Sequence, residues 1–144
     1  MNLKKLEAVK RPIEAANGLP NECYINTDYF TYEKEKIFCN KWTVIGVGSS
    51  IPKPGDAKSY NLMGIPLLLM RDTKMKIRVF HNVCSHRGFK LLDKSCTFKN
   101  VIRCPYHSWS YDFEGNLVAT PHLGGINKHD HEKFHKSKSG LKEV

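Results

Sequence analysis

The chain has 144 residues, of which 40% are hydrophobic and 26% are charged. This balance is typical of one globular domain and excludes a disordered or fibrous chain. The longest apolar run, residues 65–70, is far shorter than the ~18 residues of a membrane-spanning helix. Lysine and arginine number 23 against 14 acids, and the resulting charge of +9 permits an acidic partner without requiring nucleic acid. We therefore expect neither a membrane nor a nucleic-acid partner.

The cysteine count points to a reducing compartment. The five cysteines are an odd number, and the first residues contain no apolar stretch of the kind found in a secretory signal. We therefore expect no disulfide framework, and we expect a cytoplasmic location. The cysteines are Cys23, Cys39, Cys84, Cys96 and Cys104.

The first forty residues differ in pattern from the rest. Residues 1–20 are basic and then loop-like, which predicts a loosely held arm. A helical pattern begins near residue 27, where Thr27 or Asp28 is suited to cap it. We therefore interpret residues 1–40 as an N-terminal arm and helix.

From residue 42 to residue 118, short β-like runs alternate with turn residues, and no helical pattern separates them. This predicts an all-β fold, an antiparallel sandwich or barrel. The expected strands are residues 42–47, 57–62, 67–71, 76–80, 101–103, 109–113 and 117–118. Residues 124–144 carry many Lys and His but few large apolar groups, so we expect a linker or tail that cannot bury itself.

Two loops concentrate the groups that bind metals. Each follows an expected strand and pairs one thiol with one imidazole, as Cys84-x-His86 and Cys104-x-x-His107, with 17 residues between the two motifs. Two loops at the ends of strands are placed to meet around one centre. By ligand type, two thiolates and two imidazoles suit either zinc or an iron–sulfur cluster.

The order of the ligands favours the cluster. Zinc motifs usually place a Cys pair on one arm and a His pair on the other, whereas each arm here mixes the two types. This mixture suits an asymmetric [2Fe–2S] cluster in which Cys84 and Cys104 bind one iron while His86 and His107 bind the other. Neutral imidazoles make the cluster less negative and so raise its potential above that of an all-Cys ferredoxin. A zinc-stabilised binding module is the distant alternative.

With these residues in view, the sequence resembles the α subunits of Rieske non-haem iron oxygenases, of the ring-hydroxylating dioxygenase type. The motif Cys84-x-His86-x17-Cys104-x2-His107 carries the resemblance, which extends over about residues 19–125. Respiratory Rieske proteins add a cysteine to each loop and join the two in a disulfide, but Phe89 and Tyr106 occupy those places here.

The resemblance implies a Rieske-type antiparallel β-sandwich at residues 41–123, with a small cluster-binding subdomain of two loops and a preceding helix. Residues 124–144 would lead toward a catalytic domain that lies outside this sequence. Near the cluster, Arg87 would orient a partner carboxylate or pack, and Gly88 would let the first loop approach the sulfides closely. Trp109 would shield the cluster.

The resemblance also implies a pathway for electrons. A reductase or ferredoxin would reduce the cluster, and His107 would be the exit toward a mononuclear iron in a catalytic domain of the same or a neighbouring subunit. That iron would activate O₂, and the full-length protein would be a homo-oligomer. This chain offers no further ligand set of that kind, so we expect it to transfer electrons only, with no catalytic residue of its own. A stand-alone Rieske ferredoxin is the nearest alternative.

Overall fold

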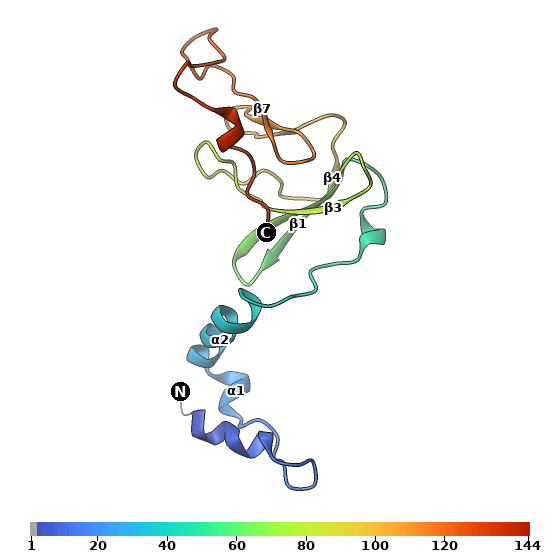
Figure 1. Cartoon of the computed structure of the whole chain (residues 1–144), viewed down its shortest axis with the longest axis vertical. Helices are drawn as coiled ribbons and strands as arrows, with labels where there is room; N and C mark the ends of the chain where they lie inside the picture. Colours follow the sequence, from blue (N-terminus) through green and yellow to red (C-terminus); the bar gives the residue numbers. More distant parts are fainter. Residues whose placement is uncertain (1–2) are drawn as a thin grey trace. The chain divides into compact units, whose positions relative to one another are not determined.

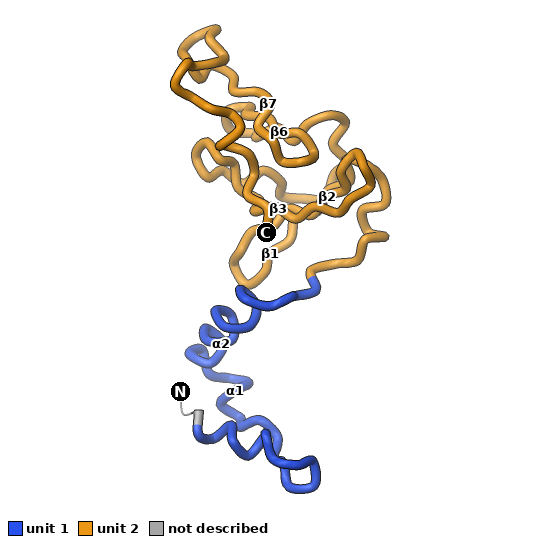
Figure 2. The backbone as a smooth tube through the Cα atoms, in the orientation of Figure 1, with its two compact units in different colours: residues 1–44 blue, residues 45–144 orange. Residues whose placement is uncertain are grey.

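The computed structural model describes residues 3–144, which form two compact units (Figure 2). Residues as far as Val44 make up one unit and Ile45–Val144 the other. Among the described residues, no helix is both long enough and apolar enough to cross a membrane. The division of function among residues 1–40, 41–123 and 124–144 stays a prediction.

The N-terminal unit is helical, and the cap of its main helix lies one residue before the first of the two expected caps. The Asn26 side chain accepts hydrogen bonds from the backbone N–H groups of Asp28 and Tyr29, at 2.8 and 3.1 Å. Asn26 is therefore the cap, in place of Thr27 or Asp28, because its short amide reaches both free N–H groups. The helical elements are η1 (Leu3–Lys10), α1 (Glu22–Ile25), α2 (Thr27–Glu33) and the π-helical turn η2 (Lys34–Phe38).

The second unit contains two antiparallel sheets (Figure 1). The larger has the order β3-β2-β1-β4, and its strands are β1 (Asp56–Leu62), β2 (Ile65–Arg71), β3 (Ile77–His81) and β4 (Cys96–Thr97). The smaller has the order β5-β6-β7, with β5 (Ile102–Arg103), β6 (Ser110–Tyr111) and β7 (Leu117–Ala119). Two short 3-10 turns, η3 (Gly48–Ser50) and η4 (Lys136–Lys138), complete the elements. The expected all-β antiparallel fold with a preceding helix is confirmed.

Strand β2 divides the apolar core. Leu68 and Met70 face the larger apolar cluster, whereas Leu67 and Leu69 face a smaller one on the opposite side. This alternation follows from the two-residue period of a strand, and it explains why residues 67–70 are continuously buried. The larger cluster also contains Cys84 and Cys104, so each of the two candidate metal-binding loops, residues 84–89 and 104–109, begins with a cysteine in the main core.

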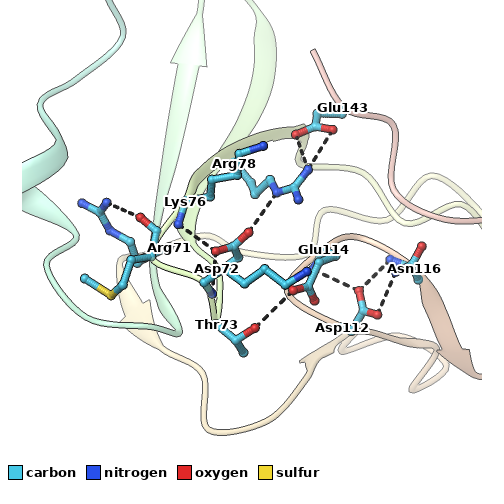
Figure 3. Close-up of polar contacts among 11 residues, drawn as sticks. Arg71, Asp72, Thr73, Lys76, Arg78, Asp112, Glu114, Asn116 and Glu143 are labelled. Carbon is cyan, nitrogen blue, oxygen red and sulfur yellow. Dashed lines mark hydrogen bonds and ion pairs between the residues drawn. The ribbon is translucent and has the colours of Figure 1, made fainter.

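A buried carboxylate shapes the turn between β2 and β3, which has no glycine (Figure 3). Asp72 is completely buried and accepts hydrogen bonds from the backbone N–H groups of Lys74 and Lys76, at 2.9 and 2.8 Å. The guanidinium of Arg78 donates to its other oxygen at 3.1 Å. Asp112 holds the turn before β7 in a similar way, and Thr73 donates to Glu114 at 3.2 Å, which joins the two turns.

Two local expectations prove wrong. Residues 42–47 form no strand, because neither sheet offers them a pairing partner. Residues 124–144 do not stay unburied as expected, because Phe134 and Leu141 pack against the main core. Backbone hydrogen bonds to the edge strand β3 hold the end of this segment, so few apolar side chains are needed.

Replacement of Asp72 by Asn tests the role of the buried carboxylate. The amide keeps one acceptor oxygen but turns an NH₂ toward Arg78, so we expect Asp72→Asn to lower the free energy of unfolding by about 1–3 kcal/mol at pH 7. Asp93→Asn, at an exposed carboxylate in a surface ion pair with Lys90, is the matched control and should have little effect. Urea unfolding measures both differences.

The same pair of proteins gives a pH test. Burial opposes ionisation of Asp72, but the N–H of Lys76 and the guanidinium of Arg78 outweigh it and hold the pKa below its ordinary value. The stabilisation is therefore complete above the unfolded pKa of about 3.9 and is lost as the pH falls through the lower folded pKa. The difference between wild type and Asp72→Asn should be constant from pH 7 to 5 and should shrink below about pH 4. A difference that grows in acid would contradict the assignment.

Candidate metal centre

The two metal-binding loops share one backbone pattern. In the first loop, the N–H of Cys84 donates to the carbonyl of Phe89 at 2.7 Å, and the Cys84 carbonyl accepts from Gly88 at 2.9 Å. In the second, the N–H of Cys104 donates to the carbonyl of Trp109 at 2.8 Å, and the Cys104 carbonyl accepts from Ser108 at 3.0 Å. Each cysteine therefore begins a tight turn that directs its side chain and the following histidine toward the other loop.

Each turn needs a left-handed residue four positions after its cysteine. Gly88 has φ +69°, and Ser108 reaches φ +58° without the freedom of glycine. A Cβ atom at Gly88 would meet no heavy atom within 4 Å, so backbone conformation is the reason for glycine there. The predicted close approach of Gly88 to a cluster stays a prediction.

The four candidate ligands form two pairs. The thiols of Cys84 and Cys104 are each 2% exposed and interact with each other. The imidazoles of His86 and His107 are half-buried, with ring centroids 4.9 Å apart and planes at 73°. The thiol pair thus lies in the core, and the imidazole pair lies nearer the surface.

Burial disfavours the negative charge of the Cys84 thiol. Burial raises the pKa of Cys84, and the neighbouring Cys104 raises it further, although the hydroxyl of Tyr111 acts in the opposite direction. Two thiolates side by side in a core need positive charge between them. An iron ion bound to both sulfurs would supply that charge.

One buried nitrogen also fits a metal bond. Nδ1 of His107 is fully buried and, among the residues that the structure describes, has no hydrogen-bond partner. Buried polar atoms without partners are rare, and a bound metal ion is one recognised explanation. Within the same described residues, no three His, Cys, Asp or Glu side chains are arranged to hold a single ion. The unpartnered nitrogen of the imidazole pair therefore suits a metal bond.

Aromatic side chains surround the imidazole pair. Trp109 is buried and stacks on His86, with centroids 4.5 Å apart and planes at 10°. Tyr106 lies against His107 at 3.7 Å and against Phe89 at 5.4 Å, so two aromatic rings bridge the loops. Arg87 is exposed beside His86. The pKa of His86 is lowered by burial, by His107 and by Arg87.

Tyr111 contacts a candidate ligand, which the ligand spacing does not reveal. Its hydroxyl lies 3.1 Å from the sulfur of Cys84 and 2.9 Å from Oγ of Ser85, and it accepts the Ser85 N–H at 3.0 Å. Burial raises the pKa of Tyr111 far above its usual range, so the hydroxyl keeps its proton and remains a donor. The sequence could have indicated this contact in one way: a tyrosine in a buried strand needs a hydrogen-bond partner for its hydroxyl.

A family model described as the Rieske [2Fe-2S] domain matches residues 41–130. The chain belongs to this family. The match includes both Cys- and His-containing loops and confirms a [2Fe–2S] cluster as the expected cofactor, whereas the assignment of its four ligands stays a prediction. Electron transfer through a [2Fe–2S] cluster is accordingly the function of this Rieske domain, and the family is that of oxidoreductases.

The chain is similar to one part of larger Rieske oxygenases. It is 34% identical over 119 residues to the carnitine monooxygenase oxygenase subunit of Acinetobacter pittii, covering 83% of this chain and 32% of that relative. The structure of the quaternary ammonium Rieske monooxygenase CntA with gamma-butyrobetaine matches with a TM-score of 0.75 and 33% identity, covering 86% and 34%. Naphthalene 1,2-dioxygenase from Rhodococcus sp. matches with a TM-score of 0.81 and 25% identity, covering 97% and 31%. The chain spans about a third of the length of these relatives.

Removal of the Tyr111 hydroxyl should lower the reduction potential of the cluster. A hydrogen bond to a ligand sulfur stabilises the reduced, more negative state more than the oxidised state. A bond of about 1 kcal/mol corresponds to roughly 40 mV for one electron, and we expect a decrease of this size in Tyr111→Phe. Tyr60→Phe, at an exposed tyrosine of β1, is the control and should leave the potential unchanged. Protein-film voltammetry measures both; an unchanged or higher potential in Tyr111→Phe contradicts the assigned bond.

Proposed function

We propose that Cys84 and Cys104 bind one iron of the cluster and that His86 and His107 bind the other. The observation that carries this assignment is the pairing of a buried thiol pair with an imidazole pair in which His107 Nδ1 is fully buried and unpartnered among the described residues. The cluster, when bound, accepts and releases one electron. The protein would hold the cluster through these four side chains, shield one side of it from water and leave a path for the electron on the other side.

His107 is the proposed electron exit, and the other residues around it define the environment. Its ring is half-buried while its Nδ1 is buried, so the rest of the imidazole is nearer solvent. Trp109 covers His86 and excludes water from that side, since its ring stacks on the imidazole. Arg87 is exposed at the same edge, where a guanidinium suits a partner carboxylate. The left-handed Gly88 closes the first loop.

We further propose that this chain is the electron-transfer part of an oxygenase α subunit. Electrons from a reductase or ferredoxin would pass through the cluster to a mononuclear non-haem iron for O₂-dependent hydroxylation or demethylation. Support comes from the relatives, which are oxygenase subunits about three times longer than the matched region. Inter-subunit electron transfer is described for a quaternary ammonium Rieske monooxygenase whose structure is similar to this chain. By analogy, the full-length protein would be a homo-oligomer, with the exit facing a neighbouring subunit.

A cytoplasmic location is part of the same proposal. Cys23, Cys39 and Cys96 are free thiols, as are the two candidate ligands, which suits a reducing compartment. The surface carries the excess of lysine and arginine that would favour an acidic electron donor.

The ligand assignment is tested by metal analysis of the purified chain. Wild type should contain iron and acid-labile sulfide in equal amounts, with a low-average-g EPR signal after reduction. Cys84→Ser and Cys104→Ser should lose most of both, because a hydroxyl is a poor replacement for a thiolate ligand. Cys96→Ser, at an exposed cysteine, is the matched control and should keep the full content. Stoichiometric zinc without visible absorption would overturn the assignment and favour a zinc-stabilised module.

A further inference from the structure

The C-terminal residues 134–144, here called the strap, end beside strand β3 (Figure 1), and Phe134 and Leu141 pack against the main apolar cluster, which contains Cys84 and Cys104. Phe134 meets the ring of Trp109 edge-on, with centroids 5.4 Å apart. The N–H of Leu141 donates to the carbonyl of Gly115 at 2.7 Å, and a Cβ atom at Gly140 would lie only 2.7 Å from that same carbonyl oxygen. Glycine at position 140 therefore allows a close approach of two backbones.

The end of the strap is joined to the edge strand β3. The N–H of His81 donates to the carbonyl of Lys142 at 2.9 Å, and the N–H of Val144 donates to the carbonyl of Val79 at 3.0 Å. Glu143 pairs with Arg78 at 3.1 Å (Figure 3). The strap is thus held at both the smaller sheet and the larger one.

Between these two attachments, the strap reaches the first metal-binding loop. Oγ of Ser85 donates to the backbone carbonyl of Ser139 at 2.6 Å. Ser85 lies between Cys84 and His86, two of the proposed ligands. A carbonyl oxygen has no proton, so the Ser85 hydroxyl proton points to the strap and Oγ can only accept from Tyr111.

The Tyr111 hydroxyl has one proton and two acceptors near it. The sulfur of Cys84 is 3.1 Å away and Oγ of Ser85 is 2.9 Å away. The backbone N–H of Ser85 donates to the Tyr111 oxygen, so it does not compete for the Tyr111 proton. Ser85 Oγ and the Cys84 sulfur therefore compete for the same proton, and Ser85 competes fully because its own proton is held by Ser139.

We propose that the strap tunes the cluster: the Ser139 carbonyl holds Ser85 as an acceptor, which draws the Tyr111 hydroxyl away from the sulfur of Cys84. Ser85 is a positioning residue in this scheme, since it acts on the sulfur through Tyr111. With the strap in place, the hydrogen bond to the sulfur is weakened and the reduction potential is lowered. This inference rests on the ligand assignment proposed above.

Ser85→Ala gives the sharpest test, because the expected sign is opposite to that of Tyr111→Phe. Without Oγ, the Tyr111 proton has only the Cys84 sulfur to bond. We expect a rise in the midpoint potential equal to about a threefold change in the reduction equilibrium, or ~28 mV for one electron. Ser85→Thr keeps the hydroxyl and should keep the wild-type potential. The measurement uses the full cluster-loaded chain.

The strap itself is tested at Gly140. Gly140→Ala puts a Cβ against the Gly115 carbonyl, which displaces the strap and takes the Ser139 carbonyl away from Ser85. The midpoint potential should rise as in Ser85→Ala. The double variant Ser85→Ala/Gly140→Ala should show no further rise in potential, since both substitutions remove the same interaction. Ser139→Ala is the matched control: it keeps the backbone carbonyl and should leave the potential unchanged.

A potential that falls or stays constant in Ser85→Ala overturns the proposal. So does a Ser139→Ala shift as large as that of Gly140→Ala. These outcomes are distinct from failure of the ligand assignment, because in that case wild type itself would show no [2Fe–2S] EPR signal. Should Gly140→Ala fold poorly, Ser85→Ala and Ser85→Thr still decide the question, since both side chains lie on an exposed position of the loop.

Discussion

Two thiols buried side by side are the constraint on which the rest of the second unit depends. Cys84 and Cys104 belong to the same apolar cluster as the buried residues of both sheets. Burial raises the pKa of Cys84, so a cation bound between the two sulfurs, as proposed, would stabilise their ionised forms in this core. The two sheets, the matching loop turns and the Tyr111 hydroxyl all place or support that pair. In this respect the cofactor is expected to contribute to folding as well as to function.

The difference in burial between the thiols and the imidazoles makes the two sides of the site unlike. The thiols lie in the core, while the histidines lie nearer the surface, where Trp109 covers His86 and Tyr106 lies against His107. Negative charge is therefore concentrated on the inner side, and the neutral ligands lie on the outer side. If His86 and His107 hold the cluster as proposed, their half-buried rings would be the part of the site nearest to a partner protein. This asymmetry is a direct result of mixing one cysteine and one histidine in each loop.

The sequence was sufficient to predict the fold class and the candidate ligands because both depend on local patterns. Alternation and turn residues located β1, β2 and β3, and the spacing of Cys and His in each loop does not depend on distant residues. The strand expected at residues 42–47 failed because a strand also needs a pairing partner, which no local pattern reports. The two-residue strand β4 escaped notice for the same reason: its pairing with β1 is a tertiary contact.

The contacts around the ligands were less predictable because they join residues far apart in the chain. Tyr111 reaches back to Cys84 from another strand, and Ser139 reaches Ser85 from the strap. Residues 124–144 looked polar enough to stay solvated, yet two apolar side chains and a strand edge were enough to fix them. The strap also lies beyond the matched Rieske region, which ends at residue 130. The contacts from Ser139 through Ser85 and Tyr111 to Cys84 therefore connect this segment to a proposed ligand, which is the structural basis of the proposed effect of the strap on the reduction potential.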